Sequence, residues 1–167
     1  MEVDILKENF SLKDFFTRKI PKTIERSTKK WSITAGPELK RNIKANLEVG
    51  LSPVKGHGRF VGYSESYRKK IMDGEYDHFN KKLRPVNLKL SGEMYKSLSV
   101  RSVKNGVQVS FKDPKAVYHD RLGAGKSKVI RRLLPGKGEQ FSKTVIDPVM
   151  KKLDNEIKTN LKKIFNE

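Results

Sequence analysis

Two short runs of alternating apolar and polar residues give the clearest local pattern in this chain. They cover residues 98–103 and 107–112 and flank Asn105-Gly106. Alternation with a period of two is typical of strands that bury one face, and Asn-Gly tolerates the positive φ angles of a type I′ turn. We therefore predict a β-hairpin over about residues 98–112, with Asn105 and Gly106 at the centre of its turn.

The segment after the hairpin predicts a short helix. Asp113-Pro114 should end the second strand, because proline cannot donate a hydrogen bond to the sheet. Residues 115–122 then have room for one or two helical turns, which we expect to end at Gly123.

Apolar residues at helical intervals predict a long helix in the first third of the chain. The apolar face is expected to comprise Ile24, Trp31, Ala35, Leu39, Ile43, Leu47 and Leu51. Such spacing is typical of an amphipathic helix, which we place at about residues 21–50. Gly36-Pro37 should kink or break this helix. Trp31 is expected to anchor the core rather than to stack on a nucleotide.

A second amphipathic pattern occupies the C-terminal part of the chain. Apolar residues recur there at intervals of three and four, namely Phe141, Val145, Val149, Leu153, Ile157, Leu161 and Ile164. Asp147 is a favourable capping residue, and Pro148 suits the first position of a helix. The pattern therefore predicts a helix that starts at Asp147-Pro148 and runs to about Phe165.

The first twenty residues are expected to form an N-terminal arm or a short helix. Ser11 and Asp14 resemble a capping pair ahead of Leu12 and two phenylalanines, which predicts a short helix up to Ile20. The rest of the chain, residues 21–167, is expected to form a single α+β domain.

Residues 54–83 are the least regular part of that domain and are expected to be a flexible insertion. Gly56, Gly58 and Gly62 lie there among basic and aromatic residues. A loop of this composition can follow a phosphate backbone or insert into a neighbouring subunit, and a mobile surface loop is the simpler interpretation. A short helix is predicted at residues 66–72, ended by Asp73-Gly74.

The chain is strongly basic, with 37 Lys and Arg against 19 Asp and Glu and a net charge of +18. Residues 85–138 contain twelve basic and three acidic residues, which is half of the excess. This concentration suggests contact with a polyanion, most often nucleic acid, but a solvated surface or an acidic protein partner explains it equally well. There is no cysteine and no apolar run of membrane-spanning length, so we expect a soluble protein made in the cytosol, without disulfides or membrane contact.

No motif in the sequence supports an enzyme. The segment 123–127, GAGKS, resembles the end of a phosphate-binding P-loop, but Asp120 occupies the position of that loop's first glycine. The three histidines share no zinc-binding spacing, and the acidic residues 73–77 lack the order of an EF-hand. We therefore expect no catalytic residue, no metal and no cofactor.

Several short segments follow one another in a characteristic order. The helical N-terminal part ends in LSPV at residues 51–54, and Pro85-Val86 leads into LSGEMYKSL at residues 90–98. The hairpin comes next, followed by AVYHDRLG at residues 116–123 and RRLLP at residues 131–135. In this order the segments resemble the virion morphogenesis, or tail-completion, family of tailed bacteriophages. That family has a proline-valine pair, a (Thr/Ser)-Gly-x-(Leu/Met)-x-x-Ser-(Leu/Ile) turn, a Tyr-x-x-x-x-x-Gly segment, an arginine-bearing strand and a C-terminal helix.

The chain also departs from the pattern of that family. The insertion between the two proline-valine pairs, residues 55–83, has no usual counterpart, and the first twenty residues resemble an added arm.

The resemblance implies an α+β fold, in which a small antiparallel sheet with the hairpin packs on the long N-terminal helix, with a C-terminal amphipathic helix. It implies a structural role without catalysis. Subunits would form a homo-oligomeric ring at the neck, or head–tail junction, of the virion and help to complete or join the tail. The partners would be further copies, the portal or connector proteins, the tail proteins and, through non-specific contact, packaged DNA. Before assembly the protein would be in the host cytoplasm.

Two sets of residues are candidate contacts in such an assembly. The candidates for contact with DNA or another polyanion are Arg121, Lys126, Lys128, Arg131 and Arg132. The candidates for subunit contact are Phe10, Phe15, Phe16, Phe60, Tyr63 and Tyr67. The alternative function is a small basic nucleic-acid-binding protein that acts outside a virion and binds DNA tightly in a salt-sensitive manner. A nucleic-acid-processing enzyme would instead require metal-dependent cleavage.

Overall fold

The computed structural model describes residues 6–11, 25–103, 106–126 and 128–165, and its fold is α+β as predicted. The larger helices are α2 (Glu25–Glu48), α3 (Glu65–Met72) and α6 (Lys143–Phe165). The strands are β1 (Leu6–Ser11), β2 (Leu98–Val103) and β3 (Gly106–Phe111). Short helical segments are the 3-10 helix η2 (Asp77–Phe79), α4 (Glu93–Ser97), α5 (Lys115–Val117) and the π-helix η3 (Tyr118–Leu122).

The described strands form one antiparallel sheet in the order β1-β3-β2. The predicted hairpin is confirmed as β2 and β3, and the expected inward residues Val107, Val109 and Phe111 are all buried. The predicted turn is wrong by one residue. Val103 lies opposite Gly106, so Gly106 belongs to β3 and the residues between the strands are 104 and 105.

Strand β1 pairs along the whole length of β3 and so adds an edge strand that the sequence pattern did not predict. The short helix expected after Ser11, with Phe15 and Phe16, lies outside the described residues.

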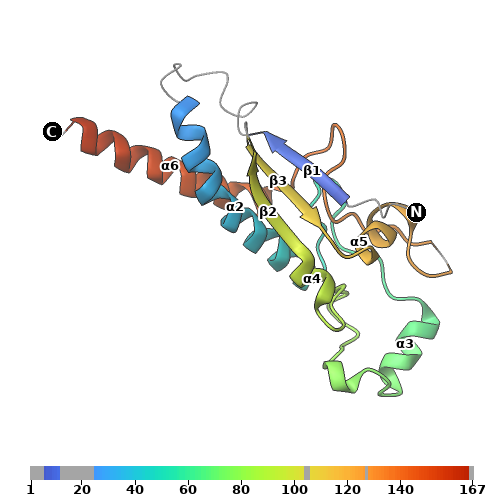
Figure 1. The fold of residues 1–167 in the computed structure, drawn as a ribbon. Helices are drawn as coiled ribbons and strands as arrows, with labels where there is room; N and C mark the ends of the chain where they lie inside the picture. The colour runs from blue at the N-terminus through green and yellow to red at the C-terminus, as the bar shows by residue number, and fades with distance from the viewer. Residues whose placement is uncertain (1–5, 12–24, 104–105, 127, 166–167) are drawn as a thin grey trace.

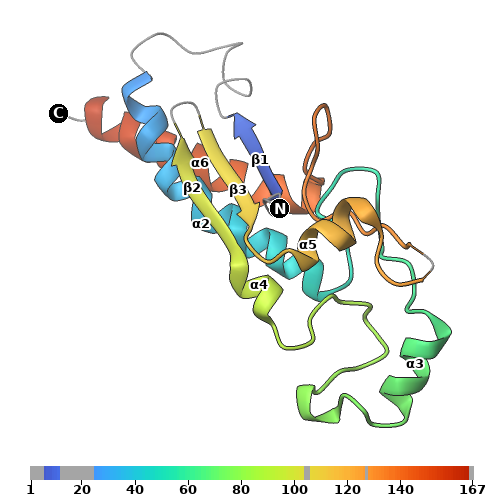
Figure 2. The same ribbon diagram turned by 45° about the vertical axis from the view of Figure 1, so that its right-hand side comes forward.

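Helix α2 packs against β2, β3 and α6, and Figures 1 and 2 show α2 and α6 on the same side of the sheet. The predicted apolar face is buried at Trp31, Ala35, Leu39, Ile43 and Leu47, whereas Leu51 lies beyond the end of α2 and is only partly buried. A continuous apolar face of this length is the main source of stability for such a helix.

Of the two expected effects of Gly36-Pro37, a kink or a break, the break is wrong, because α2 continues through both residues. Breaking the helix there would cost the burial of apolar residues on both sides, which outweighs the hydrogen bond lost at Pro37. Gly36 instead allows close packing: a Cβ atom on it would lie 3.1 Å from Val100 Cγ1 on β2.

Helix α6 begins at Lys143, four residues before the predicted start at Asp147-Pro148. Two hydrogen bonds between α2 and the first turn of α6 explain the earlier start. Asn42 Nδ2 donates to the Val145 carbonyl at 3.0 Å, and Thr144 Oγ1 donates to Asn46 Oδ1 at 2.7 Å. These bonds and the complete burial of Val145 hold the first turn of α6 although Pro148 lies inside the helix.

Residues 54–83, expected to be a flexible insertion, contact the rest of the fold near their first end. Val54 forms a β-bridge with Phe141, and Phe60 belongs to the hydrophobic core. The predicted short helix is confirmed as α3, which ends at Asp73 with Gly74 in a left-handed conformation. Figure 2 shows α3 set apart from the sheet.

Candidate functional site

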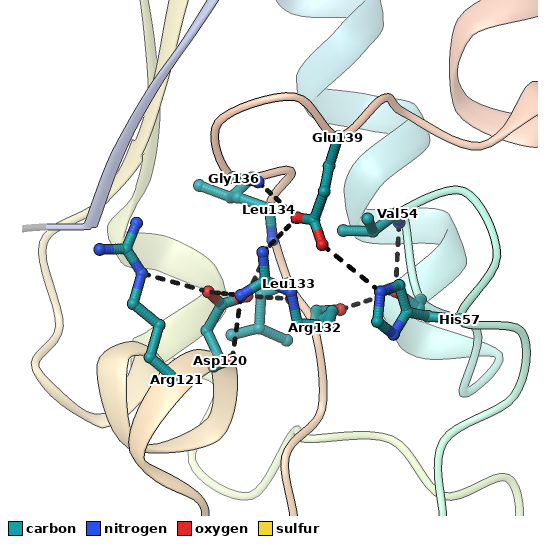
Figure 3. Close-up of polar contacts among 10 residues, drawn as sticks. Val54, His57, Asp120, Arg121, Arg132, Leu133, Leu134, Gly136 and Glu139 are labelled. Atoms are coloured by element: carbon teal, nitrogen blue, oxygen red, sulfur yellow. Dashed lines mark hydrogen bonds and ion pairs between the residues drawn. The ribbon is translucent and has the colours of Figure 1, made fainter.

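A buried carboxylate joins three of the segments on which the family resemblance rests (Figure 3). Asp120, in η3, is 1% exposed and accepts backbone hydrogen bonds from Leu133 at 2.5 Å and Leu134 at 3.2 Å. Its second oxygen accepts from Arg132 Nη1 at 2.9 Å. Ser52 then links the third segment, because its hydroxyl donates to the Arg132 carbonyl at 2.8 Å. We call these four groups, Ser52, Asp120, Arg132 and the Leu133-Leu134 backbone, the Asp120 junction.

The outer side of the Asp120 junction carries a second carboxylate. Glu139 accepts from Arg132 Nη2 and from the Gly136 backbone, the latter at 2.5 Å. The Gly136 hydrogen bond, with the Arg132 guanidinium and His57 contributing, lowers the pKa of Glu139 below its ordinary value. His57 Nε2 lies 3.6 Å from Glu139 Oε1 (Figure 3). Arg132 is thus held between two carboxylates, with its side chain only 16% exposed.

Arg131 is also buried and forms hydrogen bonds within the protein. It is 7% exposed, and its Nη2 donates to the carbonyls of Val61 and Gly62 at 3.2 and 3.1 Å. Neighbouring His119 is partly buried, and burial together with the charge of Arg131 lowers the pKa of His119 to about 4. The predicted role of Arg131 and Arg132 in polyanion contact is therefore not supported: both guanidinium groups hold segments of the fold together.

The remaining basic candidates are accessible. Lys126 and Lys128 are exposed in the loop after η3, and Arg121 is exposed on η3 with Asp120 Oδ2 3.6 Å from its Nε. The loop is closed by a β-bridge between Ala124 and Val129. The next described helix after the GAGKS segment is α6, which begins only at Lys143, so this loop lacks the arrangement by which a P-loop surrounds phosphates at a helix N-terminus.

The aromatic candidates differ in exposure. Phe60 is 9% exposed and lies in the core, so the structure does not support the expected subunit contact through this side chain. Tyr63 and Tyr67 are partly buried, with ring centroids 5.1 Å apart, and Tyr67 also packs on Tyr76 at 5.2 Å. Burial, with Tyr67 contributing, raises the pKa of Tyr63 to about 12, and its hydroxyl donates to the Asn87 carbonyl at 2.5 Å.

Phe10 lies in β1, opposite Val107, and its side chain is outside the described part of the chain, as are Phe15 and Phe16.

A buried lysine next to this aromatic cluster was missed by sequence reasoning. Lys81 is 9% exposed, and its Nζ donates to the carbonyls of Asn87 and Lys89 at 2.9 and 2.6 Å and to Asn87 Oδ1 at 2.9 Å. Burial and the charge of Arg131 lower the pKa of Lys81 to about 8. Nothing in the local sequence separates Lys81 from Lys82, because burial is decided by the tertiary fold.

Within the ranges that the structure describes, no cluster of three or more His, Asp or Glu side chains is placed to hold a metal ion. In the same ranges no helix is long and apolar enough to cross a membrane. At the Asp120 junction, Arg132 Nη1 and the backbone of Leu133 and Leu134 donate to the Asp120 carboxylate, whereas the buried Nε of Arg132 has no hydrogen-bond partner among the described residues.

Comparison with protein-family models, with curated proteins and with solved structures finds no match to this chain.

Proposed function

We propose that this chain is a structural protein of the virion of a tailed bacteriophage. In this proposal it forms part of the neck, as a ring of identical subunits, and helps to complete or join the tail. It acts by binding its neighbours and catalyses no reaction. Its partners are the portal or connector and the tail proteins.

The observation that carries the proposal is the Asp120 junction. Three of the segments that resemble the tail-completion family, residues 51–54, 116–123 and 131–135, meet there through Ser52, Asp120 and Arg132. A fourth, Pro85-Val86, packs on the end of α2, since a Cβ atom on Gly50 would lie 2.8 Å from the Val86 carbonyl oxygen. The polar residues of these segments thus bond to one another and to the backbone, as expected for a structural subunit rather than for an enzyme.

The accessible charge is compatible with a position beside packaged DNA. Lys126 and Lys128 are exposed, and contacts from such side chains to phosphates carry no sequence information. This same charge supports the alternative, a small nucleic-acid-binding protein that acts outside a virion. The two functions differ in how tightly the free protein binds DNA.

Light scattering combined with a DNA gel shift separates the two functions. We expect the purified protein to be a monomer or a closed ring and to shift duplex DNA weakly at about 150 mM salt, because few phosphate contacts survive such screening. Tight DNA binding by a small species under these conditions would contradict the structural role. If a variant with Lys126→Gln and Lys128→Gln binds DNA as strongly as the wild type does, the loop after η3 makes no contact with DNA.

A further inference from the structure

A cleft of about 460 Å³ lies between the C-terminal end of α2, the start of the 54–83 segment and residues 83–86. Its apolar lining consists of Val49, Phe60, Leu83, Pro85 and Val86. Three arginines from separate parts of the chain, Arg59, Arg68 and Arg84, line it as well. None of the residues that we assign to the Asp120 junction takes part.

The three arginines give the cleft an uncompensated positive charge. No acidic residue lines it. In the part of the chain that the structure describes, none of the three guanidinium groups makes an ion pair or a side-chain hydrogen bond. This distinguishes them from Arg131 and Arg132, whose guanidinium groups bond within the protein. Unpaired arginines beside an apolar surface provide donors for carboxylate or phosphate groups.

The walls of the cleft are fixed by buried groups. Arg131 holds the carbonyls of Val61 and Gly62 on one wall, and Arg59 is tied to Leu51 by a β-bridge. Tyr63 reaches across to the Asn87 carbonyl. Residues 83–86 form the other wall, and Lys81 holds the segment that follows them by donating to the carbonyls of Asn87 and Lys89. A cleft held in this way loses little conformational entropy when a ligand binds.

The lining favours a polypeptide over a nucleic acid. A phosphate backbone would pair with the arginines but leave the apolar floor uncovered, unless a base stacked on an aromatic ring. The Tyr63 ring is not free for stacking, because Tyr67 packs on it and Lys81 Nζ lies 5.0 Å from its centroid. Phe60 is buried in the core. A peptide that alternates acidic and apolar side chains satisfies both parts of the lining.

We propose that this cleft, which we call the arginine cleft, binds a polypeptide segment of a partner protein that carries alternating acidic and apolar side chains. Carboxylates of the segment pair with Arg59, Arg68 and Arg84, and its apolar side chains cover Leu83 and Val86. The proposal is independent of the virion role, because binding to the arginine cleft is measured on the purified chain alone.

The test is fluorescence anisotropy with a labelled peptide of alternating Glu and Leu, titrated with the full chain. We expect saturable binding that Arg59→Gln and Arg68→Gln each weaken by about tenfold, because each removes charge-assisted hydrogen bonds to a carboxylate of the peptide. Lys137→Gln, which removes an exposed charge outside the cleft, is the control and should bind as the wild type does.

Three outcomes would overturn the proposal. They are the absence of saturable binding, equal losses in the cleft and control variants, and equal binding of a peptide of alternating Lys and Leu. Competition by oligothymidine that depends on Arg59 and Arg68 would assign the cleft to nucleic acid instead. Arg59 and Arg68 are exposed, so both variants should fold, and circular dichroism checks this.

Discussion

Asp120 Oδ2 lies 2.9 Å from Arg132 Nη1, and the Asp120 side chain is fully buried. The pair connects η3 to a segment without regular secondary structure, which runs beneath it toward α6. Because the other carboxylate oxygen accepts from the backbone of Leu133 and Leu134, Asp120 satisfies groups that have no partner in a sheet. Asp120 thus bonds backbone amides that lie outside the described sheet.

Asp120→Asn should destabilise the protein strongly. The variant keeps the shape of the side chain but leaves Arg132 without its buried counter-charge, and breaking a buried ion pair costs about 3–5 kcal/mol. Urea denaturation measures the loss in the free energy of unfolding. Asp147→Asn, at an exposed position of α6, is the matched control and should stay within about 0.5 kcal/mol of the wild type. A loss below about 1 kcal/mol at Asp120 would show that the junction contributes little to stability.

Gly123→Ala should be far more damaging than Gly125→Ala. Both glycines have positive φ angles, +83° and +72°, so an alanine is strained at either position. At Gly123 a Cβ atom would also lie 2.3 Å from the Lys128 carbonyl oxygen, whereas at Gly125 it meets nothing within 4 Å. We expect a loss of about 1 kcal/mol at Gly125 and at least twice that at Gly123, measured by thermal denaturation. Equal losses of stability in the two variants would mean that the loop after η3 moves to make room for the added Cβ atom at Gly123.

The stability of the protein should fall as the pH drops from 7 to 5, and His119 should account for part of the fall. The pKa of His119 in the folded protein is about 4, below the ordinary value of 6.5. The unfolded chain therefore binds the proton first, and the stability that the neutral imidazole contributes above pH 6.5 is lost as the pH falls toward 4.

His119→Gln should flatten this dependence in urea denaturation at pH 7, 6 and 5. The groups acting on His119 are Arg131, Asp113 and Lys81, and all three remain in the variant. Glu139 does not interfere, because its lowered pKa keeps it ionised in this range. His78→Gln, at an exposed position, is the control. If the free energy of unfolding of His119→Gln depends on pH as steeply as that of the wild type, the account is contradicted.

The basic candidates should divide into two groups on substitution. Arg131→Gln and Arg132→Gln should each lower the melting temperature, because they release carbonyl or carboxylate groups that are now bonded. Lys126→Gln and Lys128→Gln should leave it unchanged and reduce the salt dependence of any DNA binding. A stable Arg132→Gln variant with weakened DNA binding would restore the role that the sequence suggested for this residue.

Much of the fold could be predicted from the sequence, because helices and strands leave their period in the apolar residues. The hairpin and the apolar faces of α2 and α6 were found in this way. The errors at Pro37 and Pro148 have one cause. Proline rules describe the local backbone cost, but both prolines lie in helices whose neighbouring residues are buried against other elements. Strand β1 was missed because it lies far from β3 in the chain.

The polar interior could not be predicted to the same extent. Arg131 and Lys126 look alike in the sequence, yet one is buried and the other exposed. Which arginine meets which carboxylate depends on how three distant segments converge. The sequence pointed to the segments that meet at the Asp120 junction and to Gly123, which ends the helical turn that carries Asp120, but not to the contacts between them.

The virion role is tested most directly by electron microscopy of particles from a phage that carries a stop codon in this gene. We expect DNA-filled heads without properly joined or completed tails, and restoration of tailed particles when the wild-type chain is supplied in trans. Particles with normal, joined tails in the absence of this chain would contradict the proposal.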